Sequence, residues 1–128
     1  MEWSDRYSLA TEAMDANHRE FMECVTRLAA APDDGVLAAL DGLIAHSVEH
    51  FECENRWMRE SGFPPIHIHA GEHQRVLALL QSVRRMSERS VAVGRQFAGE
   101  LPGWFDNHLA TMDAALAAHM KHRGFAPA

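Results

Sequence analysis

The segment HIHAGEHQRVLALLQSV, residues 67 to 83, contains the repeat of a helix with one inward face. The spacing along it is four, three, four and three residues, from His69 through His73, Val76 and Leu80 to Val83. Side chains at this spacing lie on one side of an α-helix. The first two positions of that side are histidines, so the segment predicts an amphipathic helix that carries two imidazoles toward the protein interior.

Three other segments show the same helical periodicity, and no stretch alternates as a strand does. On a first helix, from about residue 12 to residue 30, the inward positions are Met14, His18, Phe21, Val25 and Leu28. On a second helix, ending near Gly62, they are Leu37, Leu40, Ile44, Ser47, Phe51, Glu54 and Met58. On the last helix they are Phe105, His108, Met112, Ala115 and His119.

Glycines and prolines mark the connections between these helices. The segment AAAPDDG, residues 29 to 35, is expected to separate the first helix from the second, and Gly62 is expected to cap the second helix. GRQFAGELPG, residues 94 to 103, is expected to be the longest internal connection, with Pro102 in the first turn of the last helix. Short links favour antiparallel neighbours, which predicts an all-α fold: one domain over residues 1–128, an up-down-up-down four-helix bundle. An N-terminal arm with Trp3, Tyr7 and Leu9 is expected to pack on it.

Composition and charge exclude several classes of protein. The 128 residues are 47% apolar, an ordinary globular figure, and their apolar runs are too short to cross a bilayer. A net charge of −6 argues against nucleic acid or an anionic membrane as partner. The start, MEWSDRYS, does not resemble a signal peptide, and Cys24 and Cys53 do not form a Cys-x-x-Cys pair. A reduced, cytoplasmic protein is therefore expected.

Histidines interrupt every inward stripe. A single buried histidine is more often a hydrogen-bonded core residue than a metal ligand, but five on four stripes are explained most simply by one shared metal cluster. The five are His18, His50, His69, His73 and His108. Helix counting in an antiparallel bundle brings them to similar depths, within about a turn.

Two carboxylates complete the candidate site. Glu54 follows His50 by four residues and shares its face. Asp113 follows His108 by five, which in a regular α-helix turns it by about 140° onto the adjacent row with Leu109 and Leu116. From there it either reaches the metals from the side or is an ordinary exposed aspartate. Five imidazoles and two carboxylates exceed the needs of one metal and fit two metals bridged by carboxylates.

The candidate ligands belong to an ordered set of motifs: Trp3, then DANH at 15 to 18, HFECE at 50 to 54, HAGEH at 69 to 73, and WFDNH at 104 to 108 followed by Asp113. In this order, over nearly the whole chain, the sequence resembles the hemerythrin family, specifically its short bacterial members. That resemblance implies two non-heme irons with an oxo or hydroxo bridge, and O2 as their ligand.

The resemblance also implies a role for each ligand. One iron would be held by His69, His73 and His108. The other, with an open position for O2, would be held by His18 and His50. Glu54 and Asp113 would bridge the two ions.

The chain departs from the family pattern at two positions near these ligands. Asn55 stands where the family often has a second glutamate, and Phe105 where it often has leucine. The side chains expected to line an O2 pocket are Phe51, Met58, Trp104, Phe105 and Met112, although their spacing also fits ordinary core packing. His46 is expected not to be a ligand, because no carboxylate follows it one turn later as Glu54 follows His50.

The sequence is compatible with three functions. The leading one is reversible O2 binding for transport, storage or delivery by a protein that is not an enzyme, because no evident general acid or base accompanies the ligands. The second is a di-iron redox enzyme, a peroxidase or an NO-reducing protein. The third is a free-standing sensor of O2 or redox state. Delivery of O2 would require a further partner, a protein that receives it.

Overall fold

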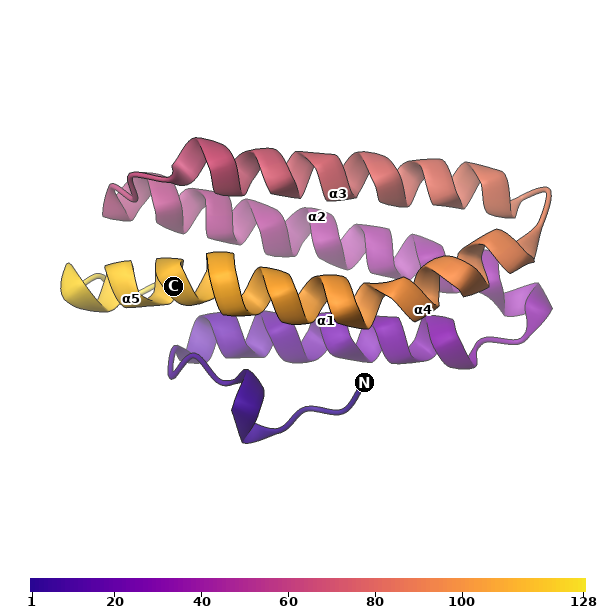
Figure 1. Cartoon of the computed structure of the whole chain (residues 1–128), viewed down its shortest axis with the longest axis horizontal. Coiled ribbons are helices and arrows are strands. Elements are labelled where there is room, and N and C mark those ends of the chain that lie inside the picture. The colour runs from indigo at the N-terminus through magenta and orange to yellow at the C-terminus, as the bar shows by residue number, and fades with distance from the viewer.

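The structure is a computed structural model that describes residues 1–128. It is all-helical, without strands, and its main helices form a four-helix bundle (Figure 1). The first three helices are α1 (Glu12–Ala30), α2 (Val36–Ser61) and α3 (Ile66–Ser87). The fourth is one continuous ribbon made of α4 (Val91–His108), the π-helical segment η3 (Leu109–Asp113) and α5 (Ala114–His122).

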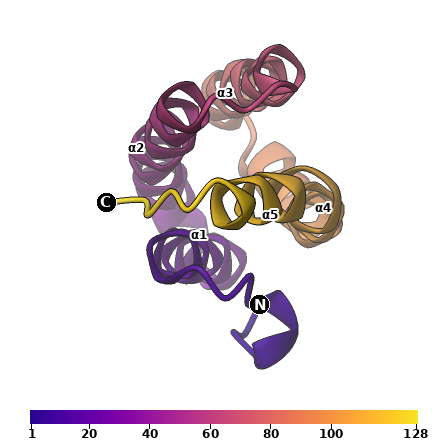
Figure 2. The ribbon, with the colours of Figure 1, turned by 90° about the vertical axis from the view of Figure 1, so that its left-hand side faces the viewer.

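The four helices alternate in direction, as short connections predict. α1 and α3 run one way along the bundle, and α2 and the α4–α5 ribbon run the other way (Figure 1). Seen from the end, the helices form a ring in which each lies between two neighbours (Figure 2). The up-down-up-down bundle predicted from the periodicity is therefore confirmed.

The α2–α3 turn follows the prediction for a glycine cap. Gly62 has a φ of 69°, the left-handed conformation in which a helix commonly ends. The amide of Phe63 then donates to the carbonyl of Met58 at 2.9 Å. Pro64 and Pro65 follow, and α3 begins at Ile66.

The prediction of a long connection over residues 94–103 is wrong. Those residues lie inside α4, and the chain leaves helix only between Ser87 and Val91, so that Pro102 is in the helix interior. Burial of Phe97 and Leu101 on the inward side of α4 outweighs the breaking tendency of the glycines and the proline.

Gly94 has a packing role in this helix rather than a breaking one. A Cβ at this position would come within 3.0 Å of Ser87 Oγ and of Val36 Cγ1. The absent side chain thus allows the start of α4 to approach α2 and the end of α3 closely.

The apolar core is divided into two clusters. The larger includes Phe21, Phe51, Val76 and Phe105, and the smaller, of seven buried residues, lies at the end where α2 meets α5. On α1, α2 and the α4–α5 ribbon the candidate metal ligands fall between members of the two clusters, and on α3 they lie between Ile66, which packs against the smaller cluster, and Val76 of the larger. A polar layer therefore crosses the bundle between two dry regions.

The N-terminal arm packs on the bundle as expected. Its short 3-10 helix, Asp5–Tyr7, buries the Tyr7 ring, which lies 6.2 Å from the ring of Phe105. Asp15 ties the arm to α1, because its carboxylate accepts from Ser8 Oγ at 2.8 Å and from the Leu9 amide at 2.9 Å. No helix of the bundle has both the length and the apolar character needed to span a membrane.

Candidate metal centre

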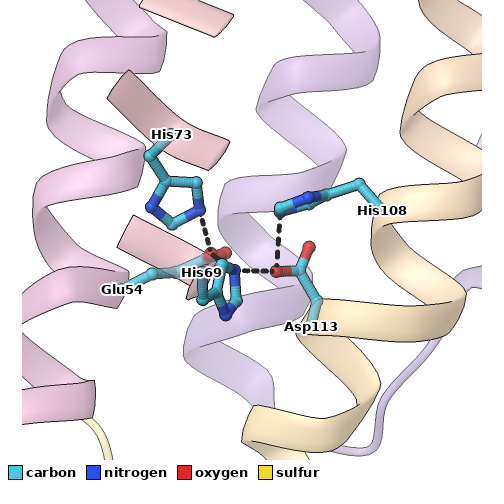
Figure 3. Close-up of side chains that lie close together, drawn as sticks. All are labelled: Glu54, His69, His73, His108 and Asp113. Atoms are coloured by element: carbon cyan, nitrogen blue, oxygen red, sulfur yellow. Dashed lines mark ion pairs between the residues drawn. The ribbon is translucent and has the colours of Figure 1, made fainter. Parts of the chain in front are cut away.

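Seven polar side chains meet in the layer between the two apolar clusters. Each is between 0% and 3% exposed, and together they come from all four helices of the bundle. They are the seven ligands expected from the sequence: His18, His50, Glu54, His69, His73, His108 and Asp113. Figure 3 shows five of them directed toward one another.

The carboxylate of Glu54 has one oxygen for each of two histidine groups. Its Oε2 lies 2.8 Å from His50 Nε2 and 3.2 Å from His18 Nε2. Its Oε1 lies 3.2 Å from His73 Nε2 and 3.4 Å from His69 Nε2. One side chain therefore stands between two sets of imidazoles.

The carboxylate of Asp113 is divided in the same way. Its Oδ2 lies 3.1 Å from His18 Nε2, and its Oδ1 lies 3.1 Å from both His69 Nε2 and His108 Nε2. Asp113 is fully buried and faces the site, as one of the two expectations held. The alternative of an exposed helical aspartate is excluded.

The π-helical segment explains how a residue five positions after His108 reaches the same site. In η3 the amide of Ala114 donates to the carbonyl of Leu109, five residues earlier, instead of four as in an α-helix. The turn thus contains one additional residue, and Asp113 takes the place over His108 that the fourth residue would take in a regular helix.

Because of this extra residue, the inward-facing row predicted for the last helix is wrong. Met112 and His119 are only half-buried and Ala115 is exposed, contrary to the expected inward row. The buried row beyond His108 is shifted by one position. It consists of Leu109, Asp113, Leu116, Ala117 and Met120.

The carboxylates and histidines change each other's protonation. Burial lowers the pKa of His18 and of His69, but the adjacent carboxylates of Asp113 and Glu54 outweigh it and raise these pKa values to about 10 and about 9. Burial raises the pKa of both carboxyl groups, and the surrounding histidines lower it to well below the usual range. In the metal-free protein the layer therefore holds carboxylates paired with imidazolium ions.

The buried polar atoms at the centre of the layer indicate whether it is suited to metal ions. Several buried atoms at its centre lie near opposite charges but make no hydrogen bond of good geometry: Nε2 of His69, His73 and His108, Oε1 of Glu54, and both oxygens of Asp113. Buried groups without partners are costly, and cations placed among them would satisfy them together. The ligand atoms of Glu54, His69, His73, His108 and Asp113 lie within 4.8 Å of one another, as do those of His18, His50 and Glu54. The residues present therefore fit two metal ions that share Glu54.

The paired charges give the metal-free protein a defined dependence of stability on pH. The raised pKa values of His18 and His69 stabilise the fold fully below the ordinary imidazole pKa of about 6.5, and this contribution is lost as pH rises toward about 9 to 10. The lowered carboxyl pKa values of Glu54 and Asp113 have the opposite pH dependence: their contribution to stability is present at neutral pH and is lost as the solution becomes acidic.

Burial lowers the pKa of His73, whose contribution to stability is lost as pH falls below about 6.5, so we expect the melting temperature of chelator-treated protein to be highest at about pH 6 and to fall steadily above about pH 6.5. Circular dichroism melting curves measure it. His69→Gln should flatten the alkaline fall, whereas His67→Gln, an exposed position two residues earlier, should not. A melting temperature that rises from pH 7 to pH 9.5 would contradict the assigned ion pairs.

Two neighbouring polar residues lie outside the layer. His46 Nε2 lies 3.1 Å from the Asn17 carbonyl and its Nδ1 lies 3.4 Å from Glu20, so the expectation that His46 is not a ligand agrees with its contacts. The carboxylate of Asp15, three residues before His18, accepts hydrogen bonds from the N-terminal arm. His18 Nδ1 has no partner.

The five expected pocket residues lie around different ligands. Phe51 stacks on His73 at a centroid distance of 4.2 Å, and Trp104 stacks on His108 at 4.7 Å. Met112 lines a cavity of about 230 Å³ together with His69. Met58 belongs to the smaller apolar cluster.

Two of the five also lie beside the histidine pair: Phe105 contacts the ring of His18, and the ring of Phe51 lies 5.3 Å from that of His50. The ring of Phe105 meets the ring of His18 edge-on at 5.4 Å and stacks with Phe21 at 5.0 Å. An apolar wall therefore borders the histidine pair, while Phe51 and Trp104 also stack on two rings of the group of three histidines.

Two contacts to the ligands were not anticipated from the sequence. The Nδ1 atom of His73 lies 2.8 Å from Asn55 Oδ1, and the indole of Trp104 donates to Glu72 at 3.0 Å while it stacks on His108. Asn55 directly follows Glu54, and Glu72 directly precedes His73. In the sequence, the only sign of these contacts is that each residue is adjacent to a ligand. Which ring each residue contacts depends on how the neighbouring helices pack.

Comparison with known proteins agrees with this geometry. The family model described as hemerythrin HHE cation binding domain matches residues 9–120. A bacteriohemerythrin of Ralstonia nicotianae is 40% identical over 97% of this chain and 91% of its own length. A myohemerythrin of Riftia pachyptila is 27% identical over 87% of this chain and 86% of its own, and a bacteriohemerythrin of Stenotrophomonas maltophilia is 24% identical over 93% and 80%. The chain belongs to the hemerythrin family.

Proposed function

We propose that this protein binds O2 reversibly at two iron ions. The observation that carries the proposal is the division of both carboxylates, each with one oxygen toward the His18 side and the other toward the group of three histidines. Such a division suits a pair of ions bridged by carboxylates better than two independent sites.

The two sides of the site offer unequal numbers of ligands. One side has three imidazoles, from His69, His73 and His108, and the other has two, from His18 and His50, while both share the carboxylates. The ion beside the histidine pair would therefore keep an open position. Two iron ions held in this way supply the electrons and the vacant coordination position that reversible O2 binding requires.

The donor set favours iron over structural zinc. Imidazole nitrogen with carboxylate oxygen suits iron, whereas structural zinc normally has four ligands that include thiolates. Neither thiol belongs to the ligand groups, since Cys24 is buried in the larger apolar cluster and Cys53 packs against the smaller one.

The surroundings of the histidine pair favour binding over catalysis. Phe21 and Phe105 border it, and the nearest additional imidazole, His46, is engaged with the Asn17 carbonyl and with Glu20. A proton-dependent redox enzyme needs a positioned acid or base that is not itself a ligand. We therefore propose a role in O2 storage, transport or delivery. The two unpaired cysteines suit a protein of the reducing cytoplasm.

Cycling between O2 and argon tests the proposal. Protein purified with iron is analysed for metal per chain, reduced anaerobically, exposed to O2, and then returned to argon while its absorption spectrum is recorded. We expect two irons per chain and a coloured oxygenated form that appears and disappears over repeated cycles. Irreversible oxidation at the first exposure would support the redox enzyme or the sensor, and zinc or a single tightly bound ion would contradict the site itself.

Phe105 is expected to control ligand access to the histidine pair. It is 1% exposed and its ring makes a T-shaped contact with the ring of His18. Phe105→Ala should lower the free energy of unfolding by about 3–5 kcal/mol through the cavity that it leaves. It should also admit water, speed autoxidation and accelerate azide binding, with both irons retained.

Stopped-flow azide binding and autoxidation rates measure this effect. Phe97→Ala, in the same helix and the same apolar cluster but without contact to a ligand ring, is the matched control for stability loss alone. Unchanged rates in Phe105→Ala at a temperature where the fold persists would restrict Phe105 to core packing.

A further inference from the structure

The five histidines of the metal layer differ in how their second ring nitrogen is held. Four of them have a buried Nδ1 without a hydrogen-bond partner: His18, His50, His69 and His108. The Nδ1 of His73 instead lies 2.8 Å from the amide oxygen of Asn55. One ring of the five therefore has a partner outside the layer that can fix both its rotation and the position of its proton.

One turn of α2 surrounds that ring. Phe51 covers its face, with 4.2 Å between centroids and 5° between planes. Glu54 Oε1 lies 3.2 Å from its Nε2, and Asn55 meets its Nδ1. Because Glu54 and Asn55 are consecutive on a helix, their side chains diverge by about 100° and reach opposite edges of the same imidazole.

The chemistry of the contact decides which nitrogen is free for a metal. A neutral imidazole carries one proton, and an amide oxygen only accepts, so the oxygen of Asn55 requires the proton on Nδ1. The lone pair of Nε2 is then directed into the layer. The opposite tautomer would place an N–H where a metal ligand is needed.

We propose that Asn55 is a positioning residue of the metal centre, which holds the proton of His73 on Nδ1 so that Nε2 is available to a metal, and which does so without adding charge. The inference rests on the proposed di-iron function. The layer already contains two buried carboxylates, Glu54 and Asp113. A third negative charge on the His73 N–H would strengthen that hydrogen bond, make the ring a stronger donor and favour the oxidised state of the ion.

The first test uses metal-free protein and needs neither iron nor O2. Nitrogen NMR of histidine-labelled protein at pH 8 reports the tautomer of His73 and the exchange rate of its ring N–H. We expect a slowly exchanging proton on Nδ1 in the wild type and its loss in Asn55→Leu, which keeps the size but removes the acceptor. A proton on Nε2 in the wild type, or an unchanged Nδ1 proton in Asn55→Leu, would overturn the proposal.

The second test uses iron-loaded protein. Asn55→Leu should weaken anaerobic iron(II) binding by about 10–100-fold, the usual cost of losing a partner of a metal-bound histidine. Asn55→Asp should keep both irons, shift the reduction potential to more negative values and speed autoxidation. Asn107→Asp is the matched control, because Asn107 directly precedes His108 but is exposed.

The outcomes separate this inference from the proposed function. Equal potentials for Asn55→Asp, Asn107→Asp and the wild type, together with an undiminished iron affinity of Asn55→Leu, would refute the positioning role even if O2 binding is reversible. If O2 binding fails while the tautomer and affinity results hold, the positioning role stands and the carrier function does not. Asn55→Asp is nearly isosteric, so it keeps the test decisive if Asn55→Leu does not fold.

Discussion

Replacing Glu54 by glutamine is expected to reduce the iron content from two ions per chain to one or fewer. Glu54 is the residue that belongs to both ligand groups, and each of its oxygens faces a different pair of histidines. Glutamine has almost the same shape, but it loses the charge, and its amide nitrogen cannot donate a lone pair to a metal. The side with two histidines then keeps only Asp113 as anionic ligand and should lose its ion first.

The loss should exceed the cost of about 10–100-fold in affinity that is typical for an outer partner of a metal ligand. Metal analysis after gel filtration and anaerobic iron(II) titration measure it. Glu52→Gln is the matched control, since Glu52 is exposed on the same helix and pairs with Arg59 at 3.1 Å. Adding Asp113→Asn to Glu54→Gln should remove the remaining ion, and two irons retained by Glu54→Gln would contradict a shared bridging carboxylate.

Inserting one alanine between Ala110 and Thr111 is expected to remove Asp113 from the site and to detach α5 from the core. η3 already contains one residue more than an α-helical turn, and a further residue would rotate everything beyond it by about 100°. The buried Leu116 and Met120 would then leave the smaller apolar cluster. At about 2–5 kcal/mol for each large side chain, the loss approaches the total stability of a typical domain, about 5–15 kcal/mol.

Deleting Ala110 instead should be far less harmful, because it closes the π turn to an α turn and leaves the residues beyond it on their original face. Thermal melting and iron content of the two variants make the comparison. Both positions are exposed, so neither change removes a core side chain directly. Equal losses from insertion and deletion would show that the π segment does not set the register of Asp113.

The connection between the third and fourth helices shows where local sequence is a poor guide. Residues 94–103 contain three glycines and a proline, which indicate a loop when each is judged by itself. In the structure Gly94 allows close packing against α2 and α3, and Phe97 and Leu101 bury their side chains. Burial in the tertiary structure outweighs intrinsic propensity, and no short window of sequence contains that information.

By itself, the sequence determined the helical fold, the order of the helices and six of the seven residues that meet in the buried layer, all except Asp113. These features are encoded in spacing, because side chains three and four residues apart share a helix face and short links make neighbouring helices antiparallel. The tertiary structure decided the rest. It inserted the π turn that brings Asp113 over His108, divided each carboxylate between two histidine groups, and placed Asn55 against His73. Each of these depends on how one helix is rotated and shifted against another, and such a displacement is fixed by packing across the whole bundle rather than by the residues of any one helix.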